Sequence, residues 1–295
     1  MYVITGATGH VGGGIANILL SIGKQVRVIG RSAERMRHLV AMGAEAYPGN
    51  MEDPGFLTGA FTGAEAVFTM IPPNVRAENL RSYQNRFTDS IVKAIRGSGV
   101  RYVVNLSSIG AQLLENTGPV LGLRDQEVAL NDIPGLNVVH LRPSYFMENL
   151  YGYIDMIKTG TFGGSLRADL RVPYIATADI ASVGSKYLVF LDFTGSRVRY
   201  LLGERDISMN EIAKTIGRVI HNRKLRYLQF SYEDSIKGMI GMGMSPDVAK
   251  AFNDLSRTAN EGLLVKGIRR DSESTTETSI EKFAKSFATL IKNAA

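Results

Sequence analysis

A glycine-rich turn directly after the first apolar stretch restricts the fold of this chain more than any other feature. Residues 2–5 read YVIT, which is typical of a buried strand, and residues 6–12 read GATGHVG. Glycines in such a turn reach positive φ and let the N–H groups of the next helix approach a pyrophosphate without a Cβ in the way. This strand–turn–helix context predicts a dinucleotide-binding unit. We expect its contacts to come from Gly6, Thr8, Gly9, His10, Val11 and Gly12.

Apolar runs and longer helical segments alternate through the first half of the chain. Continuous apolar strands separated by helices predict a parallel sheet that is covered on both faces. The expected strands are residues 2–5, 25–29, 44–47, 66–71, 102–107 and 137–141, and the expected helices are residues 12–22, 33–42, 54–61, 76–98 and 123–132. The predicted fold class is therefore α/β, with a Rossmann-type doubly wound parallel sheet and a smaller mixed C-terminal substrate lobe.

The pattern changes after the first half of the chain. We predict a dinucleotide-binding Rossmann domain over residues 1–150, with a return segment near 172–202, and a substrate or partner lobe over residues 151–295. Two Ser/Thr-x-x-Glu patterns, which begin at Ser208 and Thr278, predict capping boxes that start helices. The last helix should be amphipathic, with four apolar residues on one stripe, namely Ile280, Phe283, Phe287 and Leu290.

Composition excludes several classes of protein and site. The 295 residues include no cysteine, which excludes disulfides and zinc–sulfur sites and fits a cytoplasmic protein. The N-terminus lacks a signal-peptide pattern, and no apolar run approaches about 18 residues, so no membrane span is expected. The net charge of +6 favours an anionic ligand, but the basic residues are scattered and form no nucleic-acid recognition pattern. The four histidines show no metal-ligand spacing, so no metal site is predicted.

Arginines follow the second expected strand at the position that distinguishes NAD(H) from NADP(H). An NAD site usually offers Asp or Glu to the ribose 2′-hydroxyl there. Here the strand is followed by Arg31 and Ser32, with Arg35 one helical turn later. A guanidinium can hold a 2′-phosphate through a bidentate, charge-assisted fork, whereas a carboxylate would repel it. The predicted cofactor is therefore NADP(H).

Residues after the other strands complete the predicted site, because ligands bind outside the carboxyl ends of parallel strands. Three groups are expected near the adenine, along the cofactor, and where the nicotinamide meets the acceptor. They are Asn50, Met51 and Glu52 after the third strand, Met70, Ile71 and Pro72 after the fourth, and Ser107, Pro143, Tyr145 and Phe146 after the fifth and sixth. For a serine such as Ser107, capping of the strand end is as good an interpretation as catalysis.

Eight short motifs together resemble the NmrA-like branch of the atypical short-chain dehydrogenase/reductase superfamily. They are GATGHVGGG, VIGRSAERM, GNMEDP, VFTMIPPN, NLSSIGA, RDQEVAL, LRPSYFMENL and VPYIATADIA, and they run in this order through residue 181. The resemblance does not imply one activity, because fold does not determine function. The branch includes NAD(P)H-dependent quinone and azo-dye reductases, aromatic-ring reductases related to isoflavone reductase, and dinucleotide-sensing regulators without turnover.

Arg124 stands where several relatives carry a lysine that holds the nicotinamide ribose or assists catalysis. An arginine keeps the positive charge but does not readily give up a proton. The resemblance therefore implies a cofactor-binding or anion-positioning role for Arg124, and this departure argues against a lysine-based acid–base mechanism.

The chain lacks the tyrosine–lysine pair with which related dehydrogenases reduce a carbonyl, because none of its 12 tyrosines has a lysine four residues on. Reduction of an isolated ketone generates an alkoxide, whose proton affinity is comparable to that of hydroxide (the pKa of water is about 15.7). Reduction of a quinone generates a phenolate-like anion, and the pKa of a phenol is about 10. The missing pair therefore favours quinone-like, conjugated acceptors. Tyr145 and Ser107 are the predicted hydrogen-bond donors to the acceptor oxygen, and Phe146 is expected to pack on a ring.

Two classes of function fit these features. The leading hypothesis is an NADPH-dependent oxidoreductase that reduces quinones or similar conjugated electrophiles. The alternative is a catalytically silent NADP(H)-sensing regulator that acts on a protein partner, since the missing pair predicts this equally well. A sugar-nucleotide epimerase or dehydratase is disfavoured, because those relatives keep the tyrosine and lysine. Turnover with an acceptor distinguishes the reductase from the regulator, because only the reductase oxidises NADPH.

Overall fold

Seven parallel strands form the large sheet of the computed structural model, which describes residues 1–293. Their order is β10-β6-β5-β4-β1-β2-β3. The strands are β1 (Tyr2–Ile4), β2 (Val26–Gly30), β3 (Glu45–Pro48), β4 (Ala66–Thr69), β5 (Tyr102–Leu106), β6 (Asn137–Pro143) and β10 (Ser196–Leu201). The strand order reverses between β1 and β4, and ligands of such sheets bind at this switch point, outside the carboxyl ends. The predicted doubly wound α/β fold is confirmed.

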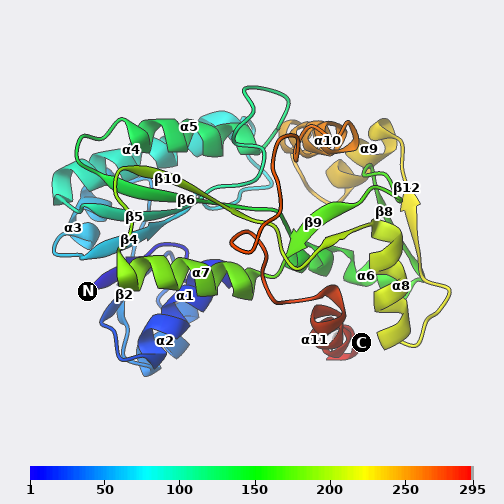
Figure 1. Ribbon diagram of the computed structural model, residues 1–295, viewed down its shortest axis with the longest axis horizontal. Helices are drawn as coiled ribbons and strands as arrows, with labels where there is room; N and C mark the ends of the chain where they lie inside the picture. The colour runs from blue at the N-terminus through cyan, green and yellow to red at the C-terminus, as the bar shows by residue number, and fades with distance from the viewer. Residues whose placement is uncertain (294–295) are drawn as a thin grey trace.

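Helices cover both faces of this sheet (Figure 1). On one face α1 (His10–Ser21) packs against α7 (Thr177–Phe190). On the other, α4 (Leu80–Ser98) lies between α3 (Pro54–Phe61) and α5 (Val120–Asn131). η1 (Glu34–Met36) and α2 (Arg37–Ala41) connect β2 to β3.

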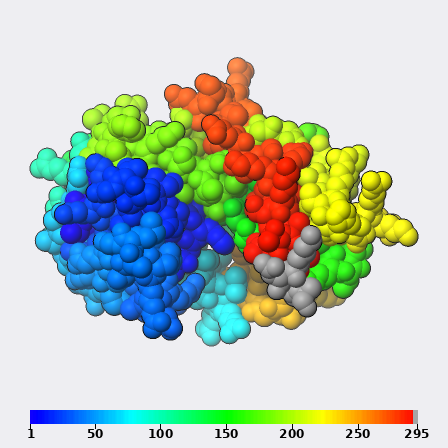
Figure 2. Space-filling model, turned by 90° about the horizontal axis from the view of Figure 1, so that it is seen from below, coloured from blue at the N-terminus to red at the C-terminus, as the bar shows by residue number. Residues whose placement is uncertain are grey.

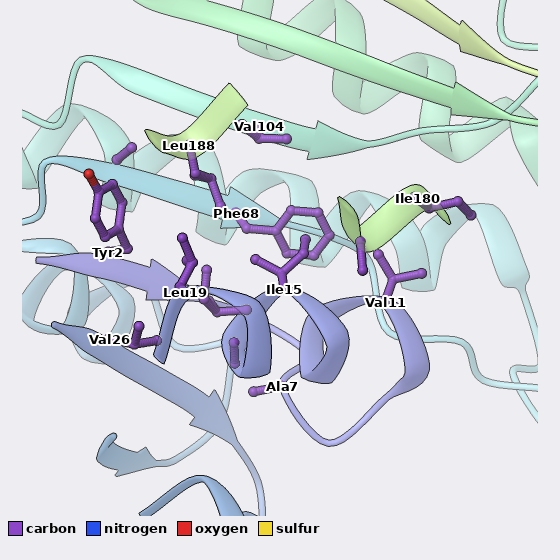
Figure 3. Packing of buried hydrophobic residues seen from close by; sticks show 14 of the residues in the cluster. Tyr2, Ala7, Val11, Ile15, Leu19, Val26, Phe68, Val104, Ile180 and Leu188 are labelled. Atoms are coloured by element: carbon purple, nitrogen blue, oxygen red, sulfur yellow. The ribbon is translucent and has the colours of Figure 1, made fainter. Parts of the chain in front are cut away.

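Each face of the sheet has its own apolar core. Under α1 and α7, Ile15 and Leu19 point at Phe68 of β4, and all three side chains are fully buried (Figure 3). On the other face, Phe61 of α3 and Ile91 of α4 belong to a second buried cluster. Because interiors are close-packed, these two cores hold the strands and the first turns of the helices in fixed relative positions.

Caps determine where the helices next to the site begin. Asp53 caps α3 ahead of Pro54, and its side chain accepts the N–H groups of Gly55 and Phe56. α4 begins at Leu80 instead of residue 76, because the side chain of Asn79 caps it there. α5 begins at Val120, three residues before its expected start. The sequence therefore predicted all three helices correctly, but it placed the starts of α4 and α5 wrongly.

A smaller lobe follows β6, and it contains two further sheets. One has the order β11-β9-β7, and in the other β12 pairs with β8 in parallel. The strands are β7 (Tyr145–Phe146), β8 (Thr161–Gly164), β9 (Val172–Ile175), β11 (Asp206–Ile207) and β12 (Arg226–Gln229). The helices are η2 (Met147–Tyr153), α6 (Ile154–Lys158), α8 (Met209–Val219), α9 (Tyr232–Gly241), α10 (Pro246–Asn260) and α11 (Ile280–Asn293). The arrowheads of β6 and β10 point toward this lobe, which therefore faces the carboxyl ends of the large sheet (Figure 1).

The expected return segment near 172–202 divides between the two lobes. α7 and β10 return to the large sheet, where β10 pairs with β6. β9 does not, because it pairs with β7 through Tyr174 and Ile175 and with β11 on its other side. The predicted domain boundary at residue 150 stays a prediction.

The two expected capping boxes have different outcomes. Ser208 and Glu211 form a complete box at the start of α8. The box at Thr278 is wrong, because Thr278 donates its hydroxyl to Asp179. Ser279 instead accepts the N–H of Lys282, which shifts the cap by one residue. Along α11 three of the four expected residues are buried, and the fourth, Leu290, is 42% exposed, a position at which the apolar stripe no longer faces the core.

Candidate functional site

The glycine turn after β1 forms an open cradle at the N-terminus of α1. Gly6 has a φ of 63°, a left-handed conformation that L side chains rarely adopt. A Cβ on Gly12 would lie 2.5 Å from the carbonyl oxygen of Gly6 and 2.7 Å from that of Thr5, so no side chain fits there. Gly9 is the N-cap and no side chain caps this helix end, while Thr8 lies half-buried in the same turn. The first N–H groups of α1 are therefore available to a phosphate, which the positive helix end favours.

The next two residues of the turn point in different directions. His10 is exposed, and its ring meets that of Tyr151 edge-on, with 5.7 Å between the ring centroids. Tyr151 in turn stacks on Phe283 of α11. Val11 is buried, so only its backbone can face a ligand. Figure 2 shows the surface hollowed between the N-terminal residues in blue and α11 in red, on the side where the two lobes face each other.

Arg31, Ser32 and Arg35 lie together after β2, as predicted. Both arginine side chains are exposed, and neither forms an ion pair within residues 1–293. The hydroxyl of Ser32 accepts the backbone N–H of Arg35 at 3.4 Å, which shapes the turn into η1. The two guanidinium groups are therefore available to an anion at this end of the sheet.

Glu52, after β3, faces the same surface but has a partner. Its carboxylate accepts from Arg86 at 2.9 Å, and Asn50 Oδ1 accepts the Glu52 N–H at 3.0 Å. The pKa of Tyr83 is raised mainly by burial and further by Glu52, while Arg31 and Arg86 lower it. Glu52, Arg31 and Arg86 therefore all lie near the Tyr83 phenol. The Glu52 carboxylate would repel a 2′-phosphate, but its ion pair with Arg86 offsets this negative charge.

The other predicted residues on this side are held mainly by the core. The side chains of Met51 and Ile71 are buried, so these residues can offer a ligand only their backbone groups. The Met70 sulfur lies 2.8 Å from where a Cβ on Gly6 would be, so Met70 packs across the glycine turn. Pro72 is half-buried. The turn and the β4 end thus form one continuous wall.

Three buried hydroxyl groups lack a hydrogen-bond partner, two of them at the carboxyl ends of β5 and β6 and one in β7, which follows β6. They belong to Ser107, Ser144 and Tyr145. Ser107 is 3% exposed, and its N–H donates to the carbonyl of Leu141 at 2.8 Å, which fixes it beside β6. A buried hydroxyl without a partner costs about 1–3 kcal/mol, so such a cluster requires an explanation such as a ligand or water. Ser107 and Tyr145 were predicted, whereas the unpaired hydroxyl of Ser144 was not.

Tyr145 extends into the smaller lobe. Its ring stacks on that of Tyr174, with 5.5 Å between the centroids, and burial raises the pKa of Tyr145, with a further contribution from Tyr153. The ring borders a small cavity of about 10 Å³, which is room for about one water molecule. A phenol with a raised pKa stays protonated at neutral pH, so Tyr145 fits hydrogen-bond donation better than proton transfer. Phe146, by contrast, packs against the core under α1 and α7.

The rest of the cavity wall comes from distant parts of the chain. The lining residues other than Tyr145 are Ile109, Val172, Pro173, Ala259, Leu264 and Val265. None of them was predicted, because each is an ordinary apolar residue or a proline with no local pattern that indicates a pocket. Only the packing of α10 and the segment after it against the β5 end brings them together.

Two of the charged residues of α5, Glu127 and Arg124, differ in whether they have an ion-pair partner. Glu127 is bound by Arg142 of β6 through both carboxylate oxygens, at 2.9 Å and 2.5 Å, and Arg142 also donates to Tyr200. This pair is buried, with side chains 5% and 11% exposed. Arg124 is half-buried and forms no ion pair within the described part of the chain. Because helices of such folds begin at the carboxyl end of the sheet, Arg124 lies near that end and is, like Arg31 and Arg35, a cation available to an anion.

A chain of buried hydrogen bonds crosses the sheet close behind Ser107. Thr69 Oγ1 donates to Asn105 Oδ1 at 3.0 Å, Asn105 Nδ2 lies 3.1 Å from His140 Nδ1, and His140 Nε2 lies 2.9 Å from Asn131 Oδ1. These partners require a neutral His140 with its proton on Nε2. Burial lowers the pKa of His140 from 6.5 to about 4, which agrees with that state.

Neither a membrane span nor a metal cluster occurs among residues 1–293. No helix there combines the length and the apolar character that a bilayer requires. No group of three or more potential ligand side chains in the same range is placed to hold a metal ion.

Known proteins provide an independent comparison. The model of the NmrA-like family matches residues 2–282. An NAD(P)H azoreductase of Xenophilus azovorans is 27% identical over 258 residues, which cover 86% of each chain. Among solved structures, an NADPH-dependent quinone oxidoreductase of Escherichia coli complexed with NADPH matches with a TM-score of 0.83, at 20% identity, over 97% of this chain and 99% of its own. A Citrobacter triphenylmethane reductase complexed with NADP(H) matches with a TM-score of 0.80, at 18% identity, over 98% and 100%. The predicted resemblance is confirmed, and the chain belongs to the NmrA-like family.

Proposed function

We propose that the protein is an NADPH-dependent oxidoreductase whose acceptor is a quinone or a similar conjugated electrophile. One observation carries the proposal: the uncapped glycine cradle after β1 and the unpaired buried hydroxyls of Ser107 and Ser144 all follow the carboxyl ends of strands in one parallel sheet. The relatives named as an azoreductase and a quinone oxidoreductase support this class of acceptor.

The residues present fit NADPH in three places. The N-terminal amides of α1 would hold the pyrophosphate, because the cradle has no room for a Cβ at Gly12 and no side chain competes for these donors. Arg31 and Arg35 would hold the 2′-phosphate. Arg124 would lie toward the nicotinamide end, where it can position an anionic group.

The hydroxyl cluster would bind the acceptor. When bound, NADPH supplies a hydride, which is one proton and two electrons, and the reduced acceptor takes its second proton from solvent. Ser107 and Ser144 would donate hydrogen bonds to the acceptor oxygen as it gains negative charge, and Tyr145 would add a third. Such donors suffice for a phenolate-like product, which needs less stabilisation than an alkoxide.

The test is NADPH oxidation, followed at 340 nm, against a panel of benzoquinones and naphthoquinones. Saturable turnover is expected. Arg31→Ala should weaken NADPH binding by about 10- to 100-fold, since a charge-assisted hydrogen bond contributes about 1.5–3 kcal/mol, and should leave NADH binding nearly unchanged. Equal losses for the two cofactors would contradict the 2′-phosphate assignment.

A dinucleotide-sensing regulator is the second candidate, and one observation favours it. The cavity beside Tyr145 has a volume of about 10 Å³, which is too small for an aromatic acceptor as it stands. Tight NADPH binding without turnover across the quinone panel would support the sensor.

A further inference from the structure

An acceptor ring cannot enter the site unless one wall of the cavity moves. A cavity that binds benzene measures about 150 Å³, and the cavity beside Tyr145 measures about 10 Å³. Tyr145, Val172 and Pro173 line it from the paired strands β7 and β9, and Ala259 lines it from α10. The remaining wall belongs to no helix or strand, and it is formed by Ile109, in the loop after β5, and by Leu264 and Val265.

The part of this wall formed by Leu264 and Val265 lies between two glycines that can act as hinges. Gly262 and Gly267 have φ angles of 73° and 77°, and a Cβ on either would meet nothing within 4 Å. The backbone at both ends of the 262–267 segment is therefore in a conformation that favours glycine, and the space beside each glycine is open. The N–H groups of Gly262 and Leu263 donate to the carbonyls of Ala259 and Thr258, so the first end also closes the C-terminus of α10. Between the hinges Leu264 is buried, whereas Val265 is half-buried. In Figure 1 the chain after α10, drawn in orange to red, passes between the two lobes before it reaches α11.

A single side chain holds the 262–267 segment against the β5 end of the site. Gln112 Nε2 donates to the carbonyl of Leu264 at 2.9 Å, and Gln112 Oε1 accepts the N–H of Gly110 at the same distance. A Cβ on Gly110 would lie 2.9 Å from Leu264 Cδ2, so the leucine packs directly on this loop. Gln112 thus links the segment to the loop that begins at Ser107.

The chain on either side of the segment is anchored, so any movement stays local. On the α10 side, the hydroxyl of Thr258 donates to the carbonyl of Asn116. On the α11 side, the guanidinium of Arg270 donates to the carbonyls of Leu202 and Gly203.

We propose that the 262–267 segment is the movable wall of the acceptor pocket, in which Leu264 and Val265 determine the size of acceptor that is reduced and Gln112 holds the wall closed. This inference rests on the proposed reductase function. The wall opens when Leu264 leaves the space beside Tyr145, and the acceptor ring then takes that space next to Tyr145, whose hydroxyl is unpaired.

Paired substitutions at Val265 test the wall without removing the buried Leu264. Val265→Ala should raise the ratio of kcat/KM for a naphthoquinone to that for a benzoquinone by roughly tenfold, and Val265→Phe should lower it by a similar factor, because small changes of volume in an apolar pocket discriminate by about 10- to 200-fold. Leu263→Ala is the matched control, since Leu263 lies in the same segment and does not line the cavity. The ratio for this control should equal that of the wild type.

Hydrogen exchange provides a readout that does not need turnover. In the NADP⁺ complex, 1-naphthol should slow amide exchange in peptides that cover residues 262–267, and Gln112→Ala should speed exchange there in its absence. Quinone turnover with an unchanged acceptor ratio in both Val265 variants would overturn the inference and leave the proposed function standing. Absence of turnover in the wild type would overturn the proposed function. If, in addition, 1-naphthol left amide exchange in residues 262–267 unchanged, the inference of a movable wall would be overturned as well.

Discussion

The dinucleotide side and the acceptor side of this site are built by different means. On the dinucleotide side the contacts come from the backbone of one turn, where Gly6, Gly9 and Gly12 leave room for a phosphate. On the acceptor side they come from side chains that separate stretches of chain bring together, such as Ser107 and Val265. A backbone cradle depends on neighbours in sequence, whereas a side-chain pocket depends on the whole tertiary structure.

This difference has consequences for stability. The cradle is supported by apolar packing, since α1 packs against α7 and Met70 packs across the glycine turn. The acceptor side needs polar groups held inside the sheet, and it lies next to the buried pair of Arg142 and Glu127 and to the hydrogen-bond chain through His140. We therefore expect the largest effects of substitution where buried charges support the acceptor side.

Arg142→Ala should destabilise the protein most. It leaves the Glu127 carboxylate buried without its partner, and breaking a buried ion pair costs about 3–5 kcal/mol. The free energy of unfolding, from urea titration of variant and wild type, measures this loss. Lys237→Ala is the control, because it removes an exposed pair with Glu233 on α9, and such pairs contribute about 0.3–0.5 kcal/mol. A loss as small as that of the control would mean that Glu127 is accommodated without Arg142.

His140 should make stability depend on pH in the mildly acidic range. Its pKa is about 4 in the folded protein and 6.5 in the unfolded chain, so between these values the unfolded state binds more protons. The stabilisation is complete above pH 6.5 and is lost as pH falls toward 4, by about 3 kcal/mol at about 1.4 kcal/mol per pKa unit. Urea titrations at pH 7.5, 6, 5 and 4.5 measure this slope.

His140→Gln is the matched variant for that slope. It should be less stable than the wild type at pH 7.5, since glutamine cannot reproduce both hydrogen bonds of the ring at the same geometry, and its stability should depend less on pH. Other groups with lowered pKa values, such as Asp125, titrate in both proteins and cancel in the comparison. Parallel pH profiles for the two proteins would show that His140 does not carry the effect.

The same contrast explains how much could be predicted from the sequence. The glycine turn, the parallel strands and the arginines after β2 depend on local spacing, and the structure places them where they were expected. Leu264 and Val265 have no such signal, since only tertiary packing brings them to Tyr145. The unpaired hydroxyl of Ser144 has no signal in the sequence, because the absence of a hydrogen-bond partner is a property of the surroundings of the side chain.

The errors in the secondary elements have the same origin. Thr278 reads as a helix cap, but its hydroxyl is bound by Asp179 from a distant part of the chain, so Ser279 caps α11 instead. α4 was expected four residues too early because Asn79, a cap inside the polar stretch, was not recognised as its start. β9 reads as a strand of the return segment, and its partner β7 follows β6 too closely to have been expected.

Gly12→Ala tests the backbone-built side directly. The new Cβ would come within 2.5–2.7 Å of the carbonyl oxygens of Gly6 and Thr5, so α1 must shift. At least one N–H of its first turn then no longer points at the phosphate. Loss of one hydrogen bond to a charged group predicts an increase in the Kd of NADPH of about 10- to 100-fold. Calorimetric titration measures it. Gly238→Ala is the control, since a Cβ there meets nothing within 4 Å in the middle of α9, and it should leave the Kd unchanged. Equal Kd values for the two variants would mean that the turn tolerates a side chain.

Ser107→Ala should have the smallest effect on stability and the most informative one. The hydroxyl of Ser107 has no partner in the folded protein, so removing it also removes its cost of burial, and the free energy of unfolding should stay the same or rise by about 1 kcal/mol. If the hydroxyl binds the acceptor, kcat/KM for a quinone should nevertheless fall by about tenfold, the equivalent of about 1.4 kcal/mol. Ser108→Ala is the contrast, because that hydroxyl already donates to the carbonyl of Ile109 at 3.0 Å. It should lose stability and keep its activity. A Ser107→Ala variant that is more stable but less active would show that the hydroxyl binds the acceptor and destabilises the fold. A loss of both stability and activity would instead show that Ser107 serves the packing of the strand end.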